Sequence, residues 1–265
     1  MIWLSIFLML IVGVTLGILG SGGSILTLPI LIYIAHIEPV TATSYTLFIV
    51  GLSALFGSIR NISSGLIDSK ILLYFGLPSL LSVYLTRYFI LPSLPDILFE
   101  LDSFKMSKDL FLIIILAFLM IISALTMLRK KTSVISKEKF NSIQTFVILF
   151  IQGIAIGIVT GFVGAGGGFL IIPVLVSLCN LPVKKAIATS LAIIAINASI
   201  GFTGDISKGI VIDYTLLLYF SISSLLGTFI GLIIGKSINE NQLKIIFGWF
   251  VLIMGVFIFV KELFF

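Results

Sequence analysis

The stretch Gly20-Ser21-Gly22-Gly23-Ser24, which leads to Pro29, returns in the second half of the chain as Gly164-Ala165-Gly166-Gly167-Gly168, which leads to Pro173. Both copies interrupt apolar segments. Glycine and proline break a helix and free backbone groups, which a membrane tolerates only where these groups line a cavity or pack against protein. A matched pair of broken apolar segments is typical of a membrane transporter site.

The composition places the chain in a membrane. Hydrophobic residues make up 59% and charged residues 10%, whereas soluble domains average roughly 45–50% and about 25%. Apolar stretches at 110–128, 143–163 and 212–234 reach the length of about 20 residues that a spanning helix needs. The sequence therefore predicts an all-α, polytopic membrane protein. Its net charge of +5 comes from loop residues and indicates orientation in the membrane, not nucleic-acid binding.

The sequence offers no set of residues for catalysis or for a cofactor. The single cysteine, Cys179, and the single histidine, His36, cannot build a disulfide or a Cys/His metal site. The glycine clusters lack the Lys-Ser/Thr of a Walker loop and do not follow a strand. We therefore expect no enzymatic activity, no cofactor and no metal.

The two halves of the chain look like copies of one unit. One offset of 144 residues (Gly20 to Gly164) aligns the glycines, prolines and leucines around the two breaks, and a further shift of two residues aligns Ala42-Thr43-Ser44 with Ala188-Thr189-Ser190 and Gly51 with Asn197. An internal duplication explains this pattern. It predicts five apolar segments per half, at 2–19, 24–35, 40–59, 71–91 and 110–128, and at 143–163, 168–179, 185–202, 214–235 and 243–260.

Charge predicts how these segments are oriented. The most basic loop lies between the halves, at 129–142, and should be cytoplasmic. Five crossings per half keep most Lys and Arg residues on that side, invert the second repeat and place both termini outside. We thus expect a first transmembrane repeat at 1–128, a cytoplasmic linker at 129–142 and a second repeat at 143–265, with a surface loop at 92–108. Residues 24–35 span only about 18 Å as a helix, so whether the short segments fully cross stays open.

The glycine breaks are the candidate ligand site. Two helix N-termini that begin at Ser24 and Gly168 could converge near the midplane, where their partial positive charges would attract an anion. The alternative is that small residues only let helices pack closely, which we favour for Gly13-xxx-Gly17 and Gly157-xxx-Gly161. The residues expected to line the site are Gly20, Ser21, Gly22, Gly23, Ser24, Gly164, Ala165, Gly166, Gly167 and Gly168.

Polar side chains early in the following helices could complete this site. The hydroxyls of Thr43, Ser44, Thr189 and Ser190 could bind substrate oxygens, or could cap or bond back to their own helices. Asn197 needs a partner within its apolar segment, either the substrate or a neighbouring helix.

Charged residues remain near the ends of the apolar segments. Arg60 could attract an anion at the cytoplasmic mouth, or could be an interfacial anchor. Arg87 is expected to extend toward the outer interface. The acidic residues, including Asp68, Asp205 and Asp213, fall near segment ends, so a carboxylate relay through the bilayer is not expected.

The paired glycine motifs with Pro29 and Pro173, together with the Ala-Thr-Ser triplets at 42–44 and 188–190, resemble the sulfite exporter TauE/SafE family across nearly the whole chain. The resemblance implies a bacterial inner-membrane transporter that moves sulfite, sulfonates or other small organic anions, usually outward. It carries over the glycine bends and the Thr-Ser pairs as site residues. Ser24 stands where the second half has Gly168, so the two halves of the site need not be equivalent.

These observations predict a secondary transporter that exports a small anion by alternating access between the glycine breaks. The alternatives are an anion channel with the same helix-end site, and a scaffold whose glycines only pack helices. An inside-negative potential favours anion exit, so export without a coupling ion is one hypothesis. The expected partners are the anion and membrane lipids. The cargo, the direction, the coupling and the oligomeric state, monomer or homodimer, stay open.

Overall fold

The computed structural model describes residues 2–20, 24–62, 64–95, 97–101, 104–128, 142–163, 168–177, 179, 181–207, 209–235 and 237–264. The predicted linker at 129–142 lies outside these residues except for Ser142, which begins a helix.

The described residues of each predicted apolar segment are mainly helical. The helices of the first half are α1 (Ile2–Leu19), α2 (Ser24–Pro29) with the π-helical turn η2 (Ile30–Ile34), α3 (Pro39–Ile62), the continuous run of α4 (Ser69–Ile71), η3 (Leu72–Gly76), α5 (Leu77–Leu85), η4 (Thr86–Ile90) and α6 (Leu91–Ser93), and α7 (Lys108–Leu128). The second half contains α8 (Ser142–Val163), α9 (Gly168–Ser177), α10 (Val183–Ile206), α11 (Tyr214–Gly235) and α12 (Glu240–Phe264). The prediction of an all-α fold is confirmed.

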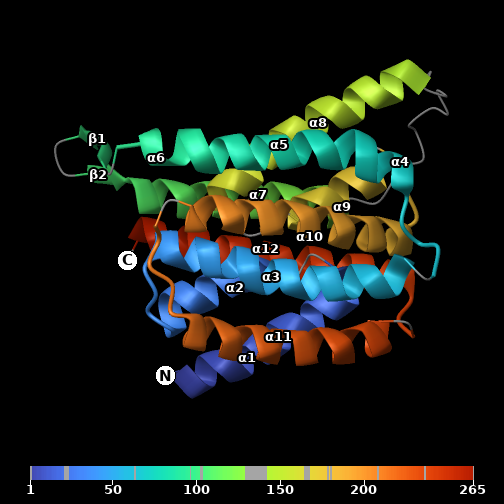
Figure 1. The fold of residues 1–265 in the computed structure, drawn as a ribbon, viewed down its shortest axis with the longest axis horizontal. Helices are drawn as coiled ribbons and strands as arrows, with labels where there is room; N and C mark the ends of the chain where they lie inside the picture. Colours follow the sequence, from blue (N-terminus) through green and yellow to red (C-terminus); the bar gives the residue numbers. More distant parts are fainter. Residues whose placement is uncertain are drawn as a thin grey trace.

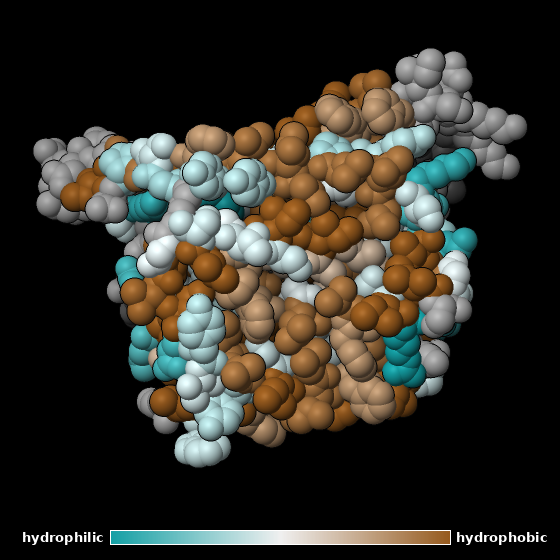
Figure 2. All heavy atoms as spheres, in the orientation of Figure 1, coloured by the Kyte–Doolittle hydropathy of each residue, from teal (hydrophilic) through white to brown (hydrophobic). Residues whose placement is uncertain are grey.

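The helices are long and apolar enough for a membrane. Among the described residues, five helices qualify by length and composition to cross a bilayer, namely Ile2–Leu19, Pro39–Ile62, Ser69–Ser93, Val183–Ile206 and Tyr214–Gly235. Figure 2 shows hydrophobic side chains over the middle of one face and hydrophilic ones toward its two ends. Such a band can face hydrocarbon while the polar ends face the two interfaces.

The helices run roughly along one common direction, so the molecule has two ends (Figure 1). We call the end where α7 finishes and α8 begins the linker end, and the opposite end, which carries both chain termini, the terminal end. The short segment η2 leads back toward the terminal end, where α3 begins. Helix α10 runs the other way and begins at the linker end.

Two pairs of helices pack closely because glycines replace side chains at their contacts. Helix α1 packs against α11, and α8 packs against α5. A Cβ on Gly13 would overlap the carbonyl oxygen of Ser224, and one on Gly157 would overlap that of Ser79. Gly17 meets the backbone of α11 and Gly161 meets Thr86 in the same way. The packing role predicted for these four glycines is confirmed.

The centre of the bundle is the antiparallel pair α3 and α10. Both helices have 24 residues, and they begin at the offset of the glycine breaks, 144 residues (Pro39 to Val183). The helix bounds therefore keep this offset without the two-residue shift that aligns the Ala-Thr-Ser triplets. With this offset, Ser53 of α3 corresponds to Asn197 of α10.

The expected surface loop at 92–108 contains a small hairpin. Strands β1 (Ile97–Leu101) and β2 (Phe104–Ser107) pair antiparallel, with Glu100 opposite Lys105. The hairpin projects from the terminal end (Figure 1). Its position agrees with a surface segment, but local strand pairing orders the chain where the sequence predicts a loop.

Candidate functional site

The described part of the first glycine break bends sharply against α10. Gly20 directly follows α1 and has a φ of 70°, in the left-handed region that favours glycine. A Cβ at this position would lie 2.7 Å from Cγ2 of Ile187, near the start of α10. Both the backbone angle and the close approach therefore require glycine at residue 20.

Two further residues of the breaks, Ser24 and Gly168, are among the described residues. Ser24 begins α2 and Gly168 begins α9, and both residues are buried. Helix α2 contacts α9, so the two short segments meet inside the bundle. The remaining break residues predicted to line the site lie outside the described residues: Ser21, Gly22, Gly23, Gly164, Ala165, Gly166 and Gly167.

The four predicted hydroxyls do not meet in one place. Thr43 and Ser44 lie where α3 begins, at the terminal end, whereas Thr189 and Ser190 lie in α10 near the linker end. Thr43 donates to the carbonyl of Val40 and Ser190 to that of Ile187, so both bond back to their own helices.

The other two hydroxyls connect different helices. The Thr189 hydroxyl accepts a hydrogen bond of 3.0 Å from the backbone N–H of Asp68, which caps α4. The Ser44 hydroxyl donates to Oδ2 of Asp205 at 2.6 Å. These two side chains therefore join the central helices to their neighbours, one at each end.

Asn197 also makes an interhelical contact. It is fully buried in α10, and its Nδ2 donates to the hydroxyl of Ser79 in α5 at 2.7 Å. The corresponding residue of α3, Ser53, lies 3.0 Å from the hydroxyl of Ser224 in α11. Oδ1 of Asn197 is buried and has no hydrogen-bond partner among the described residues, so one acceptor remains in the middle of the bundle.

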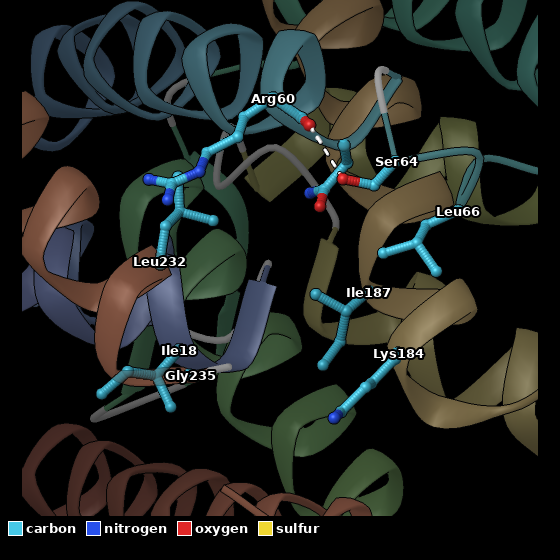
Figure 3. Close-up of a pocket in the computed structure, with 10 residues that line it drawn as sticks. Ile18, Arg60, Ser64, Leu66, Lys184, Ile187, Leu232 and Gly235 are labelled. Atoms are coloured by element: carbon cyan, nitrogen blue, oxygen red, sulfur yellow. Dashed lines mark hydrogen bonds between the residues drawn. The ribbon is translucent and has the colours of Figure 1, made fainter. Parts of the chain in front are cut away.

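A pocket of about 240 Å³ opens at the linker end between α1, α3, α10 and α11 (Figure 3). Arg60 lines it from α3, with its guanidinium directed toward α11 and 5.9 Å from the centre of the Phe229 ring, and Lys184 lines it from α10. None of the described lining residues is acidic. Those residues are Gly17, Ile18, Arg60, Asn61, Ser64, Leu66, Lys184, Ile187, Leu232 and Gly235. Two cations without a carboxylate in the same lining make the pocket attractive to anions.

This pocket adjoins the first glycine break. Gly17 lies one turn before the break, and Ile187 lines the pocket while contacting Gly20. Ile187 therefore lies at the pocket and against Gly20. Arg60, which the sequence predicts to attract an anion at the cytoplasmic mouth, lines the same pocket.

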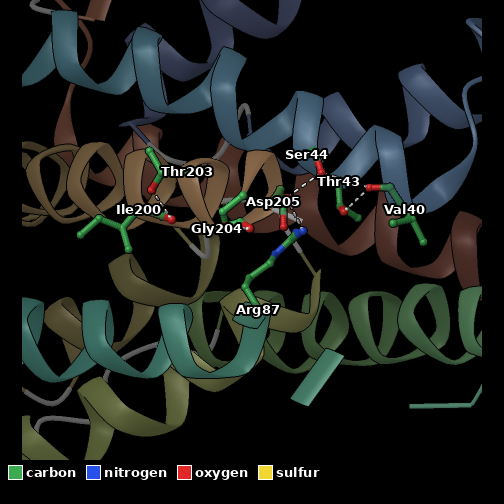
Figure 4. Close-up of polar contacts among 9 residues, drawn as sticks. Val40, Thr43, Ser44, Arg87, Ile200, Thr203, Gly204 and Asp205 are labelled. Carbon is green, nitrogen blue, oxygen red and sulfur yellow. Dashed lines mark hydrogen bonds and ion pairs between the residues drawn. The ribbon is translucent and has the colours of Figure 1, made fainter. Parts of the chain in front are cut away.

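Figure 4 shows a second polar cluster at the terminal end, built around Asp205 near the end of α10. Nη1 of Arg87, in η4, donates to Oδ2 of Asp205 at 2.7 Å. Oδ2 therefore receives hydrogen bonds from Arg87 and Ser44, which come from different helices. Arg87 and Asp205 are only 1% and 2% exposed, so water contributes little to their charge stabilisation.

This cluster corrects the expectation for Arg87 and adds a partner that the sequence did not identify. Arg87 does not extend to the interface but turns into the bundle toward Asp205. Asp205 lies near the end of its helix, as expected, yet its carboxylate is inside the protein because α3, η4 and α10 enclose it. The available signal was an arginine inside an apolar segment, which usually requires a partner, but the sequence does not reveal which carboxylate supplies it.

Comparison with known proteins places this architecture in a family. The model of the sulfite exporter TauE/SafE family matches residues 5–261. A probable membrane transporter protein of Xylella fastidiosa (strain 9a5c) is 26% identical, over 94% of this chain and 91% of its own. The probable membrane transporter protein YdhB of Bacillus subtilis is 28% identical, over 86% and 88% of the two chains. No solved structure matches the chain. Since the family match extends over nearly all of its length, the chain belongs to the sulfite exporter TauE/SafE family.

Proposed function

We propose that the protein is a secondary transporter that exports a small anion, such as sulfite or a sulfonate, by alternating access around the two glycine breaks. The observation that carries this proposal is the linker-end pocket, where Arg60 and Lys184 face a space that adjoins the break at Gly20. Oxyanions of sulfur suit such a pocket because they accept charge-assisted hydrogen bonds from guanidinium and ammonium groups.

Membership of the family makes the chain a multi-pass membrane transporter of the bacterial inner membrane, and not an enzyme. The finer statements belong to the proposal: the sulfur anion, the outward direction and the alternation between two open states. In this proposal the anion site extends from the linker-end pocket to the two short helices α2 and α9.

We further propose that the two halves are inverted repeats, with the linker on the cytoplasmic side. Three observations support this. When each helix is replaced by its counterpart in the other half, α1 becomes α8 and α11 becomes α5, so the α1–α11 contact corresponds to the α8–α5 contact. The same replacement converts the Ser53–Ser224 contact into the Asn197–Ser79 contact. Both termini lie at one end while α3 and α10 run in opposite directions, as five crossings per half require.

The pocket can be tested by removing its cations. In proteoliposomes, Arg60→Gln and Lys184→Gln should each raise the sulfite concentration that gives half-maximal transport by about 5- to 10-fold, the effect of roughly 1–1.4 kcal/mol of lost attraction. Lys70→Gln is the matched control, because Lys70 is an exposed cation in α4 outside this pocket.

The same vesicles distinguish the alternatives. Saturable flux at low turnover supports a carrier, and unsaturable currents far above carrier rates would support a channel. A protein that moves neither sulfite nor sulfonates, sulfate or carboxylates would contradict anion transport itself.

A further inference from the structure

We infer that Arg87 binds the transported anion on the terminal side of the pathway, and that Asp205 takes the place of the anion when this side is closed. The inference rests on the proposed function, and it assigns a specific role to a residue pair that the linker-end pocket does not use. Its basis is the buried cluster of Ser44, Arg87 and Asp205.

The first step is the chemistry of the cluster. A guanidinium buried to 1% exposure is costly in a membrane protein unless an anion compensates it, and such residues mark ion and substrate pathways. A carboxylate and a sulfonate or sulfite present similar oxygens to a guanidinium. Asp205 therefore occupies the position that a small oxyanion could take, and its Oδ2 already holds the Arg87 nitrogen at 2.7 Å.

The second step is the position of Arg87 beside the second glycine break. Its neighbour Thr86 packs against Gly161, where a Cβ would lie 2.6 Å from Cβ of Thr86. Gly161 lies in the last turn of α8, directly before the break at 164–167. The chain therefore places Arg87 beside the end of α8 that leads into the second break, much as the linker-end pocket includes Gly17 near the end of α1.

The third step compares the two ends. At the offset of the glycine breaks, Gly17 corresponds to Gly161 and Asn61 corresponds to Asp205. Gly17 and Asn61 line a pocket that is open at the linker end. Gly161 and Asp205 lie at the terminal end, where Asp205 instead links α3 and η4 to α10 through hydrogen bonds. The structure is thus open at the linker end and tied together at the terminal end.

A transport step follows from this arrangement. Opening the terminal end separates Asp205 from Arg87, and the anion compensates the guanidinium while the pair is apart. Release follows when Asp205 returns to Arg87 and displaces the anion. Because an anion replaces Asp205 as the partner of Arg87, opening is easier when the anion is present. Because Asp205 then returns, the anion does not stay bound to the buried guanidinium.

The experiment compares two variants that both lack the ion pair but differ in the guanidinium: Asp205→Asn and the double variant Arg87→Gln/Asp205→Asn. Both carry Thr43→Cys as reporter in a Cys179→Ser background. Thr43 is 3% exposed and adjoins Ser44, so its labelling by a membrane-impermeant maleimide from the terminal side reports opening. Methanesulfonate is the probe, because sulfite itself adds to maleimides.

We expect both variants to label faster than the parent that retains the pair. Methanesulfonate should slow labelling of the Asp205→Asn variant. The double variant should need a methanesulfonate concentration at least about tenfold higher for the same protection, because it lacks the charge-assisted hydrogen bond of Arg87. Equal protection of both variants, or protection of neither, would overturn the role of Arg87. Sulfite and methanesulfonate flux through the wild-type protein is measured separately, so a failure of anion transport is distinguished from a failure of this assignment.

Discussion

At the scale of single residues, the Cys179 thiol is largely shielded from water and lies near a carboxylate, although it is outside the long helices. It lies between α9 and α10, at the end where Asp68 caps α4. Burial, with a smaller contribution from the negative charge of Asp68, raises the pKa of the Cys179 thiol to about 11. Both causes disfavour the thiolate, which is the reactive form.

This pKa predicts slow chemistry at neutral pH. The rate at which iodoacetamide alkylates Cys179 in the folded protein should keep rising between pH 8 and about pH 11, and at pH 7.5 it should be roughly 300-fold below that of an ordinary thiol with a pKa near 8.5. Protein unfolded in dodecyl sulfate is the control and should react at the ordinary rate. A labelling rate that levels off near pH 9 in the folded protein would contradict the assignment.

Arg87 and Asp205 show which part of the site a sequence can predict. The glycine breaks and Arg60 follow from local patterns, because helix interruption and charge at a helix end depend on neighbouring residues. The Arg87–Asp205 pair joins positions 118 residues apart, and neither residue has a local pattern that identifies the other. Helix packing brings them together, so the sequence predicts that Arg87 needs a partner without identifying it.

At the scale of elements, the glycines of α1 and α8 determine how closely these helices approach their neighbours. We expect Gly13→Ala and Gly157→Ala to destabilise the protein by about 1–3 kcal/mol each, because the added methyl group overlaps a backbone carbonyl that cannot move alone. The measurement is thermal unfolding of the purified variants in detergent.

Gly204→Ala is the matched control for this prediction. Gly204 lies inside α10, and among the described residues no atom outside its chain neighbours and the adjacent backbone of this helix lies within 4 Å of the position that an added methyl group would take. Alanine should therefore be neutral there or should stabilise the helix by up to about 1 kcal/mol. Equal melting temperatures for all three variants would show that the small residues of α1 and α8 are not required for packing.

The elements themselves were largely predictable, because apolar length is a local property. Helix α11 begins and ends at Tyr214 and Gly235, the bounds expected from the sequence. The structure differs from the prediction where tertiary contacts or an unusual backbone geometry determine the local conformation. The segment after Pro29 continues as a π-helical turn, and the segment at 92–108 forms a hairpin because two short stretches pair with each other.

At the scale of the whole molecule, the two ends differ in charge and in access. The linker end has an open pocket with Arg60 and Lys184, whereas the terminal end has a buried pair whose formal charges cancel. An anion from the linker side would therefore meet positive charge first. Under the proposed orientation, this asymmetry favours entry from the cytoplasm.

Membrane potential then supplies a driving force for export. An inside-negative potential of 100 mV favours the exit of each negative charge by about 2.3 kcal/mol, which corresponds to a roughly 50-fold concentration ratio. Asp205 lies inside the protein, but its pairing with Arg87 leaves no net formal charge that must cross with the anion. We therefore expect anion efflux from proteoliposomes to accelerate as a potassium diffusion potential makes the interior negative, without any proton or sodium gradient.

The decisive comparison varies one gradient at a time. At a fixed sulfonate gradient, efflux should increase with interior-negative potential and should change little when a pH or sodium gradient is added at zero potential. Strict dependence on a proton gradient would instead contradict export driven by the potential alone. The Asp205→Asn variant extends this comparison, because its efflux should keep the same response to potential if the anion alone carries the charge.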